Sequence, residues 1–139
     1  MAYRKDWIQP QVGPMGFANT MKTIGRVVAI SATDNVTANT VGAFKVPAGF
    51  TVTGIIAVST DLDAGTNAMT ISVGDAALGT RYLSASVIGQ AGTTTQTLAT
   101  TGLLFLNTVD TEILITFTLG ATVPAAGTIA LYLVGFMAQ

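Results

Sequence analysis

The sequence contains no cysteine and no histidine, and these two absences remove most of the side chains on which enzymes rely. Without cysteine the chain forms no disulfide and offers no thiolate to a metal ion, and without histidine the commonest general base is missing. Five serines remain, but only carboxylates or lysine are available to activate them. We therefore expect a protein that is not an enzyme and that uses no cofactor.

Charged residues are also scarce, since they make up 9% of the chain where about a quarter is usual. Half of the 139 residues are hydrophobic, so a monomer could not cover itself with charged side chains. The stretch 113–139 carries no charge, but its threonines, its glycines and Pro124 interrupt any apolar helix of about 20 residues. The composition favours a protein that hides much of its surface against other subunits, and not in a membrane.

The few charges are unevenly placed along the chain. Residues 1–26 carry four cations and one acid, whereas residues 27–139 carry two cations and six acids. Four dispersed cations are too few for a nucleic-acid patch, so we expect no nucleic-acid partner. The first residues, MAYRKDWIQPQVG, lack the apolar segment of a secretion signal.

Residues 1–22 are predicted to form an extended N-terminal arm ahead of one domain at 23–139. Pro10 and Pro14 prevent a regular helix, yet the segment is too apolar for a free tail. Its only tryptophan is expected to be buried, either on its own domain or on a partner or sister subunit. The residues that we expect to make this contact are Arg4, Lys5, Trp7, Ile8 and Phe17, with the two cations orienting the arm on an acidic surface.

From residue 23 onward, short β-rich runs alternate with turn residues, which is typical of an antiparallel β-sandwich. Strands are expected at 23–31, 41–46, 50–60, 68–75, 101–107, 111–120 and 128–137. The sequence holds no convincing helix, and the best candidate for one is short, at 80–86. This pattern predicts an all-β, jelly-roll-like sandwich of about seven or eight strands. In the last strand both faces are apolar, so we expect the arm or another subunit to cover one of them.

The stretch VGDAALGTRYLSASVIGQAG, residues 73–92, holds a single acid and a single base in an uncharged setting. Asp75 and Arg81 lie six residues apart between two predicted strands. We interpret this stretch as a structural corner in which Arg81 pairs with Asp75 or caps backbone carbonyls, while Tyr82 packs under the sandwich.

A second acidic pair, Asp61 and Asp63, lies in the segment STDLDAGTN. Two carboxylates could suggest a glycosidase, and together with Asn67 they are hard oxygen donors of the kind that Ca²⁺ prefers. The glutamate that completes a calcium loop is absent, and Asp and Gly favour tight hairpins in any case. The sequence therefore favours a structural turn and leaves open whether an ion binds there.

Three segments carry a resemblance to a known family: VPAGFTVTGIIAVSTDLDAGTNAMTISVGDA at 46–76, TRYLSASVIGQAG at 80–92, and GTIALYLVGFM at 127–137. In this order they resemble small virion proteins of tailed bacteriophages, namely capsid decoration or cement proteins and the related head-fibre proteins. The resemblance covers roughly residues 44–136 and excludes residues 1–40.

The resemblance implies a homotrimeric jelly roll on the outer capsid surface of the virion. A decoration protein of this kind would bind the major capsid protein and stabilise the shell by bridging neighbouring capsid subunits. One alternative is a head-fibre or tail component that contacts the host surface. Another is a bacterial self-assembling surface or matrix protein, which usually carries an export signal.

Overall fold

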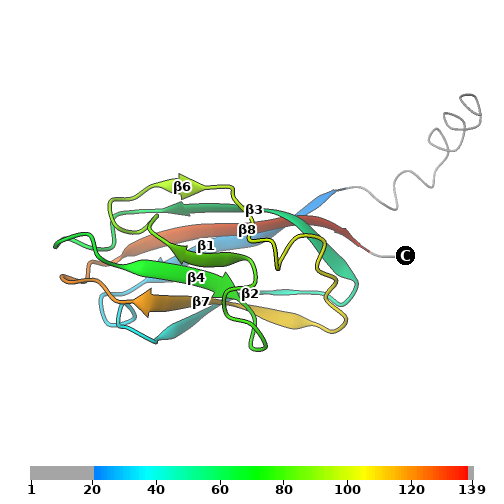
Figure 1. Cartoon of the computed structure of the whole chain (residues 1–139), viewed down its shortest axis with the longest axis horizontal. Coiled ribbons are helices and arrows are strands. Elements are labelled where there is room, and N and C mark those ends of the chain that lie inside the picture. Colours follow the sequence, from blue (N-terminus) through cyan, green and yellow to red (C-terminus); the bar gives the residue numbers. More distant parts are fainter. Residues whose placement is uncertain (1–20, 138–139) are drawn as a thin grey trace, which may run out of the picture.

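The structure, a computed structural model, describes residues 21–137, and within this range it contains eight β-strands and no helix (Figure 1). The strands are β1 (Lys22–Ile30), β2 (Thr40–Val46), β3 (Phe50–Ser59), β4 (Thr70–Gly74), β5 (Leu83–Ser86), β6 (Thr94–Thr95), β7 (Thr111–Leu119) and β8 (Gly127–Met137). No helix of residues 21–137 is long and apolar enough to cross a membrane.

The strands form two four-stranded antiparallel sheets in the orders β1-β8-β3-β6 and β2-β7-β4-β5, here called the β8 sheet and the β7 sheet. Strand β1 pairs with β8, β2 with β7, β3 with β6, and β4 with β5. This is the pairing of one long hairpin that has been folded over on itself, which is the jelly roll. The prediction of an antiparallel jelly-roll-like sandwich is confirmed.

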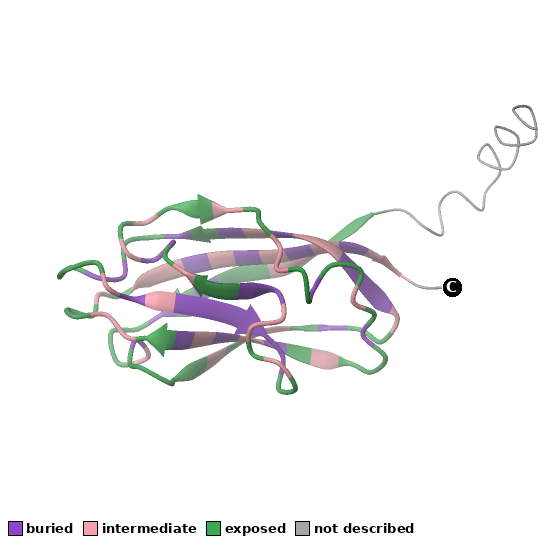
Figure 2. Cartoon of the chain, in the orientation of Figure 1, coloured by how far each residue is buried: buried purple, intermediate pink, exposed green. Residues whose placement is uncertain are grey.

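The core lies between the two sheets and is built from alternate residues of each strand. On β8 the side chains of Ile129, Leu131 and Leu133 are fully buried, and on β7 Ile115 and Phe117 are fully buried from the other side. The buried positions therefore recur at every second residue along both strands (Figure 2). A period of two is what a strand with one face on the core requires.

The short helix candidate at 80–86 forms no helix. Residues 80–82 lie in a turn, and residues 83–86 form the strand β5, whose register pairs Leu83 with Val73 and Ser86 with Ile71. Leu83 is buried by this pairing, and Ala85 has a φ of 46°, which an α-helix does not allow. Tertiary packing here overrides a weak local preference.

The predicted strand at 101–107 is a looped segment that makes only one isolated bridge, between Leu106 and Thr51. Leu104 has a φ of 57° and breaks the extended conformation in the middle of the apolar run. The short strand β6, which pairs with the end of β3, was not predicted, because two threonines carry no periodic pattern.

Candidate functional site

The two ends of the sandwich carry different loops. The chain enters at Met21, beside the end of β8, and loops 47–49, 75–82 and 96–110 lie at this N-terminal end. The opposite end carries the loops that follow β1, β3 and β7 (Figure 1). The predicted corner therefore lies at the end where the chain enters the sandwich.

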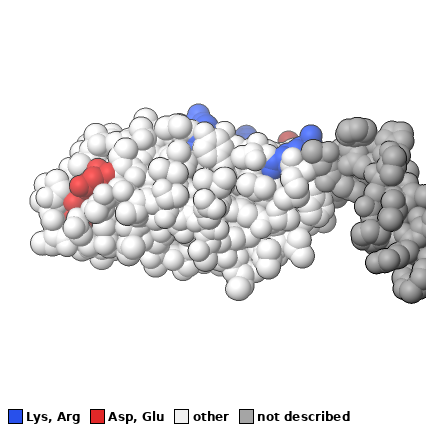
Figure 3. All heavy atoms as spheres, turned by 90° about the horizontal axis from the view of Figure 1, so that it is seen from above, with Lys and Arg blue, Asp and Glu red and all other residues white. Residues whose placement is uncertain are grey.

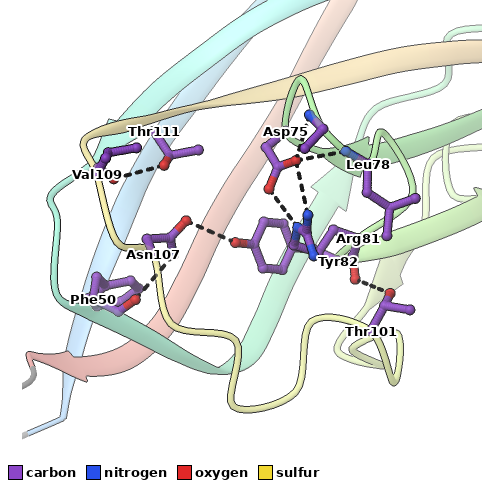
Figure 4. A network of polar contacts seen from close by, with 10 residues as sticks. Phe50, Asp75, Leu78, Arg81, Tyr82, Thr101, Asn107, Val109 and Thr111 are labelled. Carbon is purple, nitrogen blue, oxygen red and sulfur yellow. Dashed lines mark hydrogen bonds and ion pairs between the residues drawn. The ribbon is translucent and has the colours of Figure 1, made fainter.

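The corner begins where β4 ends, because the carboxylate of Asp75 caps the turn that follows. Its Oδ1 accepts hydrogen bonds from the backbone N–H groups of Ala77 and Leu78, at 3.0 and 2.8 Å. The Nε of Arg81 donates to Asp75 Oδ2 at 2.6 Å, and Nη2 of the same guanidinium reaches Oδ1 at 3.4 Å (Figure 4). Both side chains are largely buried, with 14% of Arg81 and 6% of Asp75 exposed.

Aromatic and amide groups continue the network into the loop before β7. The guanidinium carbon of Arg81 lies 3.8 Å from the ring centroid of Phe105, which also meets the buried Tyr82 ring edge-on. The Tyr82 hydroxyl donates to Asn107 Oδ1 at 3.4 Å, and Asn107 Nδ2 donates to the carbonyl of Phe50 at 3.1 Å (Figure 4). Burial raises the pKa of Tyr82, so its hydroxyl stays protonated and can donate. These contacts hold loops of a single chain together.

An open depression of about 380 Å³ lies beside this corner, between the loops at 75–81 and 105–112. The carboxylates of Asp110 and Glu112 contribute to its wall, together with Val109 and Leu114. Asp110 is partly engaged, because its Oδ1 accepts the N–H of Ala48 at 3.0 Å. Among residues 21–137, no three acidic side chains gather closely enough to hold a metal ion.

At the opposite end, Asp63 is fully occupied as a hydrogen-bond acceptor. Its two carboxylate oxygens accept from five donors, which are the N–H groups of Gly65, Ala68, Met69 and Val123 and the hydroxyl of Thr122, at 3.0 to 3.3 Å. Asp61 accepts the N–H of Asp63 itself at 3.0 Å. Asp63 therefore ties loop 60–69 to loop 120–126, and neither oxygen is free for a substrate or an ion. Residue types alone did not predict this role.

No protein-family model matches the chain, and no curated protein matches it. Among solved structures, a chain from the capsid asymmetric unit of cyanophage Pam1 is 35% identical, over 88% of each chain, with a TM-score of 0.77. The chain belongs to a family of bacteriophage capsid proteins.

Two more distant structures share the fold of this capsid protein. A chain of the Ralstonia phage GP4 capsid is 20% identical over 88% of the present chain, with a TM-score of 0.79. A chain from the acid-stable capsid of Helicobacter pylori phage KHP30 is 10% identical, with a TM-score of 0.55. The predicted resemblance to virion structural proteins is therefore confirmed to the extent that the relatives are phage capsid proteins.

The predicted contact residues of the arm, Arg4, Lys5, Trp7, Ile8 and Phe17, lie outside the described residues of this capsid protein. Of the predicted site residues, the structure brings together Asp75, Arg81 and Tyr82. The partners of this corner that the sequence did not reveal are Phe105 and Asn107, which are more than 20 residues away along the chain.

The two capped carboxylates give the capsid protein a defined response to acid. Burial would raise the pKa of Asp63, but hydrogen bonds from three backbone N–H groups and one hydroxyl outweigh this effect. They hold the pKa well below its ordinary value. Burial would also raise the pKa of Asp75, but the hydrogen bonds from Arg81 and from the Leu78 N–H outweigh this effect. The pKa of Asp75 is therefore lowered as well. A carboxylate with a lower pKa in the folded state stabilises it above the unfolded pKa and loses that contribution as pH falls.

We therefore expect Tm to be nearly constant between about pH 5 and 8, where the chain has no histidine to titrate, and to fall steadily below about pH 4. Differential scanning calorimetry in matched ionic strength measures this profile. A Tm that stays level or rises between pH 4 and 2 would contradict the role assigned to these two carboxylates.

Proposed function

We propose that this protein is a capsid decoration or cement protein, which binds the outer surface of the phage shell as a homotrimer and stabilises it by bridging neighbouring major capsid subunits. The observation that carries the proposal is the similarity to a capsid chain of cyanophage Pam1, at 35% identity over 88% of both chains. The fold, the scarcity of charge and the absence of histidine and cysteine all suit a structural subunit.

A cement protein stabilises a shell by binding only to the assembled form. Any protein that binds one state and not the other shifts the equilibrium toward the bound state, by an amount that grows with its free concentration over Kd. A trimer presents three binding elements together, so modest contacts combine into a durable one. The sandwich itself is a closed core, and it supplies a rigid body that can hold such elements in place.

The N-terminal arm is the element that we propose makes the contact with the shell. Its sequence combines Trp7, Ile8 and Phe17 with the two cations Arg4 and Lys5. Aromatic side chains and arginine are the residues that dominate binding energy at protein interfaces. The two cations suit the arm to an acidic surface on the shell.

Deleting residues 1–20 is expected to abolish binding to purified expanded capsids while the sandwich remains folded and oligomeric. The physical reason is that the eight strands described all lie within residues 22–137, whereas the deletion removes all of the proposed anchoring side chains. The measurement is co-sedimentation with capsids, with the copy ratio read from stained gels and the fold checked by circular dichroism.

Point variants of the full-length chain provide the matched controls for this deletion. Trp7→Ala should weaken capsid binding at least tenfold, whereas Gln11→Ala, in the same segment, should leave it unchanged. If the truncated protein still decorates capsids, the arm is not the anchor. If neither the full-length nor the truncated protein binds capsids but both bind host cells, the role of a head-fibre or tail component replaces the proposal.

A further inference from the structure

The outer faces of the two sheets differ sharply in chemistry. On the β8 sheet, the outward positions of β1, β8 and β3 are aligned by register and hold only apolar, glycine and threonine residues. The large apolar members are Val27, Ile56, Val58, Tyr132, Val134 and Phe136. We call this surface the uncharged face. Figure 3 views it from the side on which β6, β3, β8 and β1 lie in Figure 1, and most of it carries neither acid nor base.

The outer face of the β7 sheet is polar by comparison. Hydroxyl groups line it, including Thr70 and Thr118, whose side chains hydrogen-bond at 2.7 Å. Lys45 and Glu112 stand opposite each other across β2 and β7. Antiparallel sheets commonly have one face on the core and one face in water, and the β7 sheet follows this rule. The uncharged face departs from it, and a contiguous apolar surface of this kind marks an interaction site.

The two strand glycines of the uncharged face differ in the space above them. The Tyr132 ring lies against Gly25 on β1, so closely that a side chain on Gly25 would collide with it. Above Gly54 on β3, only the Cβ of Val134 comes within 4 Å of the place that a Cβ would take. A protruding apolar side chain from another molecule can therefore settle at Gly54 between its larger neighbours.

A second apolar surface projects from the border of the same sheet. Leu103, Leu104 and Leu106, here called the leucine loop, are 56%, 62% and 43% exposed. Backbone hydrogen bonds fix the loop against β3, since Leu104 N–H donates to Val52 O at 2.7 Å. Leu104 has a φ of 57°, a left-handed conformation that is costly for leucine, and such strain is typical of sites where another molecule binds.

We propose that the leucine loop of one copy packs on the uncharged face of the next copy, so that three copies close into a ring. Both surfaces are apolar and belong to the same sheet and its border, but they are two different surfaces. A contact between two different surfaces repeats from copy to copy, and it closes into a ring when the rotation between copies allows it. Neither carries a charge that would select a foreign partner. The inference specifies the interface of the proposed homotrimer and does not depend on where the trimer binds the shell.

Ring closure and edge chemistry support a second copy as the occupant. Three strands about 4.8 Å apart and about nine residues long give a face of roughly 400 Å² in outline. Each contact of the ring covers at most this face on one copy and the leucine loop on the next, which is at the low end for specific interfaces, and the closed ring makes three such contacts at once. Pairing through the free edge of β1 is disfavoured, because Lys22 and Arg26 stand exposed along it.

The test compares variants of the full chain by size-exclusion chromatography with light scattering, without capsids present. Val27→Glu places a charge on the uncharged face and should give monomers. Thr40→Glu, equally exposed on edge strand β2 of the other sheet, should leave the trimer intact. Leu104→Asn removes the apolar side chain and favours the left-handed backbone, so it should also give a folded monomer. A wild-type monomer, or trimers of both Val27→Glu and Leu104→Asn, would overturn the inference.

Cross-linking separates this packing from a face-to-face dimer, and the absence of native cysteine makes it unambiguous. Ala130→Cys alone, with a short bismaleimide, should give little cross-linked product. A mixture of the two variants should give products in which an Ala130→Cys chain is linked to a Leu104→Cys chain. Efficient dimers from Ala130→Cys alone would exclude the ring. Since no capsid is used, these results stand apart from the capsid-binding assay, whose failure would reject the cement role alone.

Discussion

Replacing Asp63 by alanine is expected to lower the Tm of the protein by on the order of 10 °C. The carboxylate accepts hydrogen bonds from four backbone N–H groups and one hydroxyl, and 1% of the residue is exposed. Removing it leaves these donors without partners in a space that water does not readily fill, and each unsatisfied buried donor is costly. The two loops that it joins should also separate, which exposes Met69 and Leu62 behind them.

The neighbouring acid provides a matched control for this prediction. Asp61→Ala removes an exposed carboxylate that accepts one N–H, so its Tm should change by a few degrees at most. Asp63→Asn keeps one acceptor oxygen, so its Tm should lie between those of Asp61→Ala and Asp63→Ala. Thermal melts at a single protein concentration measure all three. Equal effects of Asp61→Ala and Asp63→Ala would show that Asp63 is an ordinary turn residue, and a rise in Tm on adding Ca²⁺ would restore the ion-binding interpretation.

The strands of the sandwich could be predicted because their signal is local. In β4, β7 and β8 every second residue is apolar, and this alternation specifies both the conformation and the face that enters the core. The expectation that one outer face needs cover also came from the sequence, since β8 is apolar on both sides. The exposed leucine loop could not be foreseen, because an apolar run such as 103–106 is ordinarily buried in a strand.

The candidate site was predictable only in part, for a similar reason. Asp75 and Arg81 are six residues apart at the end of a strand, so a contact between them follows from the turn alone. Phe105 reaches Arg81 through the fold and not through the sequence, because β6 and a long loop intervene. The five donors around Asp63 are likewise brought together by two loops that are about 60 residues apart. Such clusters depend on tertiary structure, and no local pattern encodes them.

Replacing Arg81 by alanine is expected to lower the free energy of unfolding by about 2–4 kcal/mol. Asp75 is 6% exposed in the native chain, and the substitution removes both the guanidinium that neutralises it and the stacking contact with the Phe105 ring. Loss of one partner from a buried ion pair costs more than the pair itself contributes, because a charge remains in a poorly solvated place. Arg81→Lys should recover part of the loss, since ammonium supplies charge but not the planar fork.

A double-mutant cycle distinguishes this ion pair from general packing. In Asp75→Asn the amide oxygen can still accept the N–H groups of Ala77 and Leu78, and once Arg81 is also replaced no buried charge remains at the corner. Arg81→Ala should therefore cost much less in the Asp75→Asn background than in the native chain, with a coupling of about 1–3 kcal/mol. Arg26→Ala, on the exposed edge of β1, should change stability by about 0.5 kcal/mol or less. Strict additivity of the Asp75 and Arg81 substitutions in urea titrations would mean that the corner is stabilised by the packing of Tyr82 and Phe105 alone.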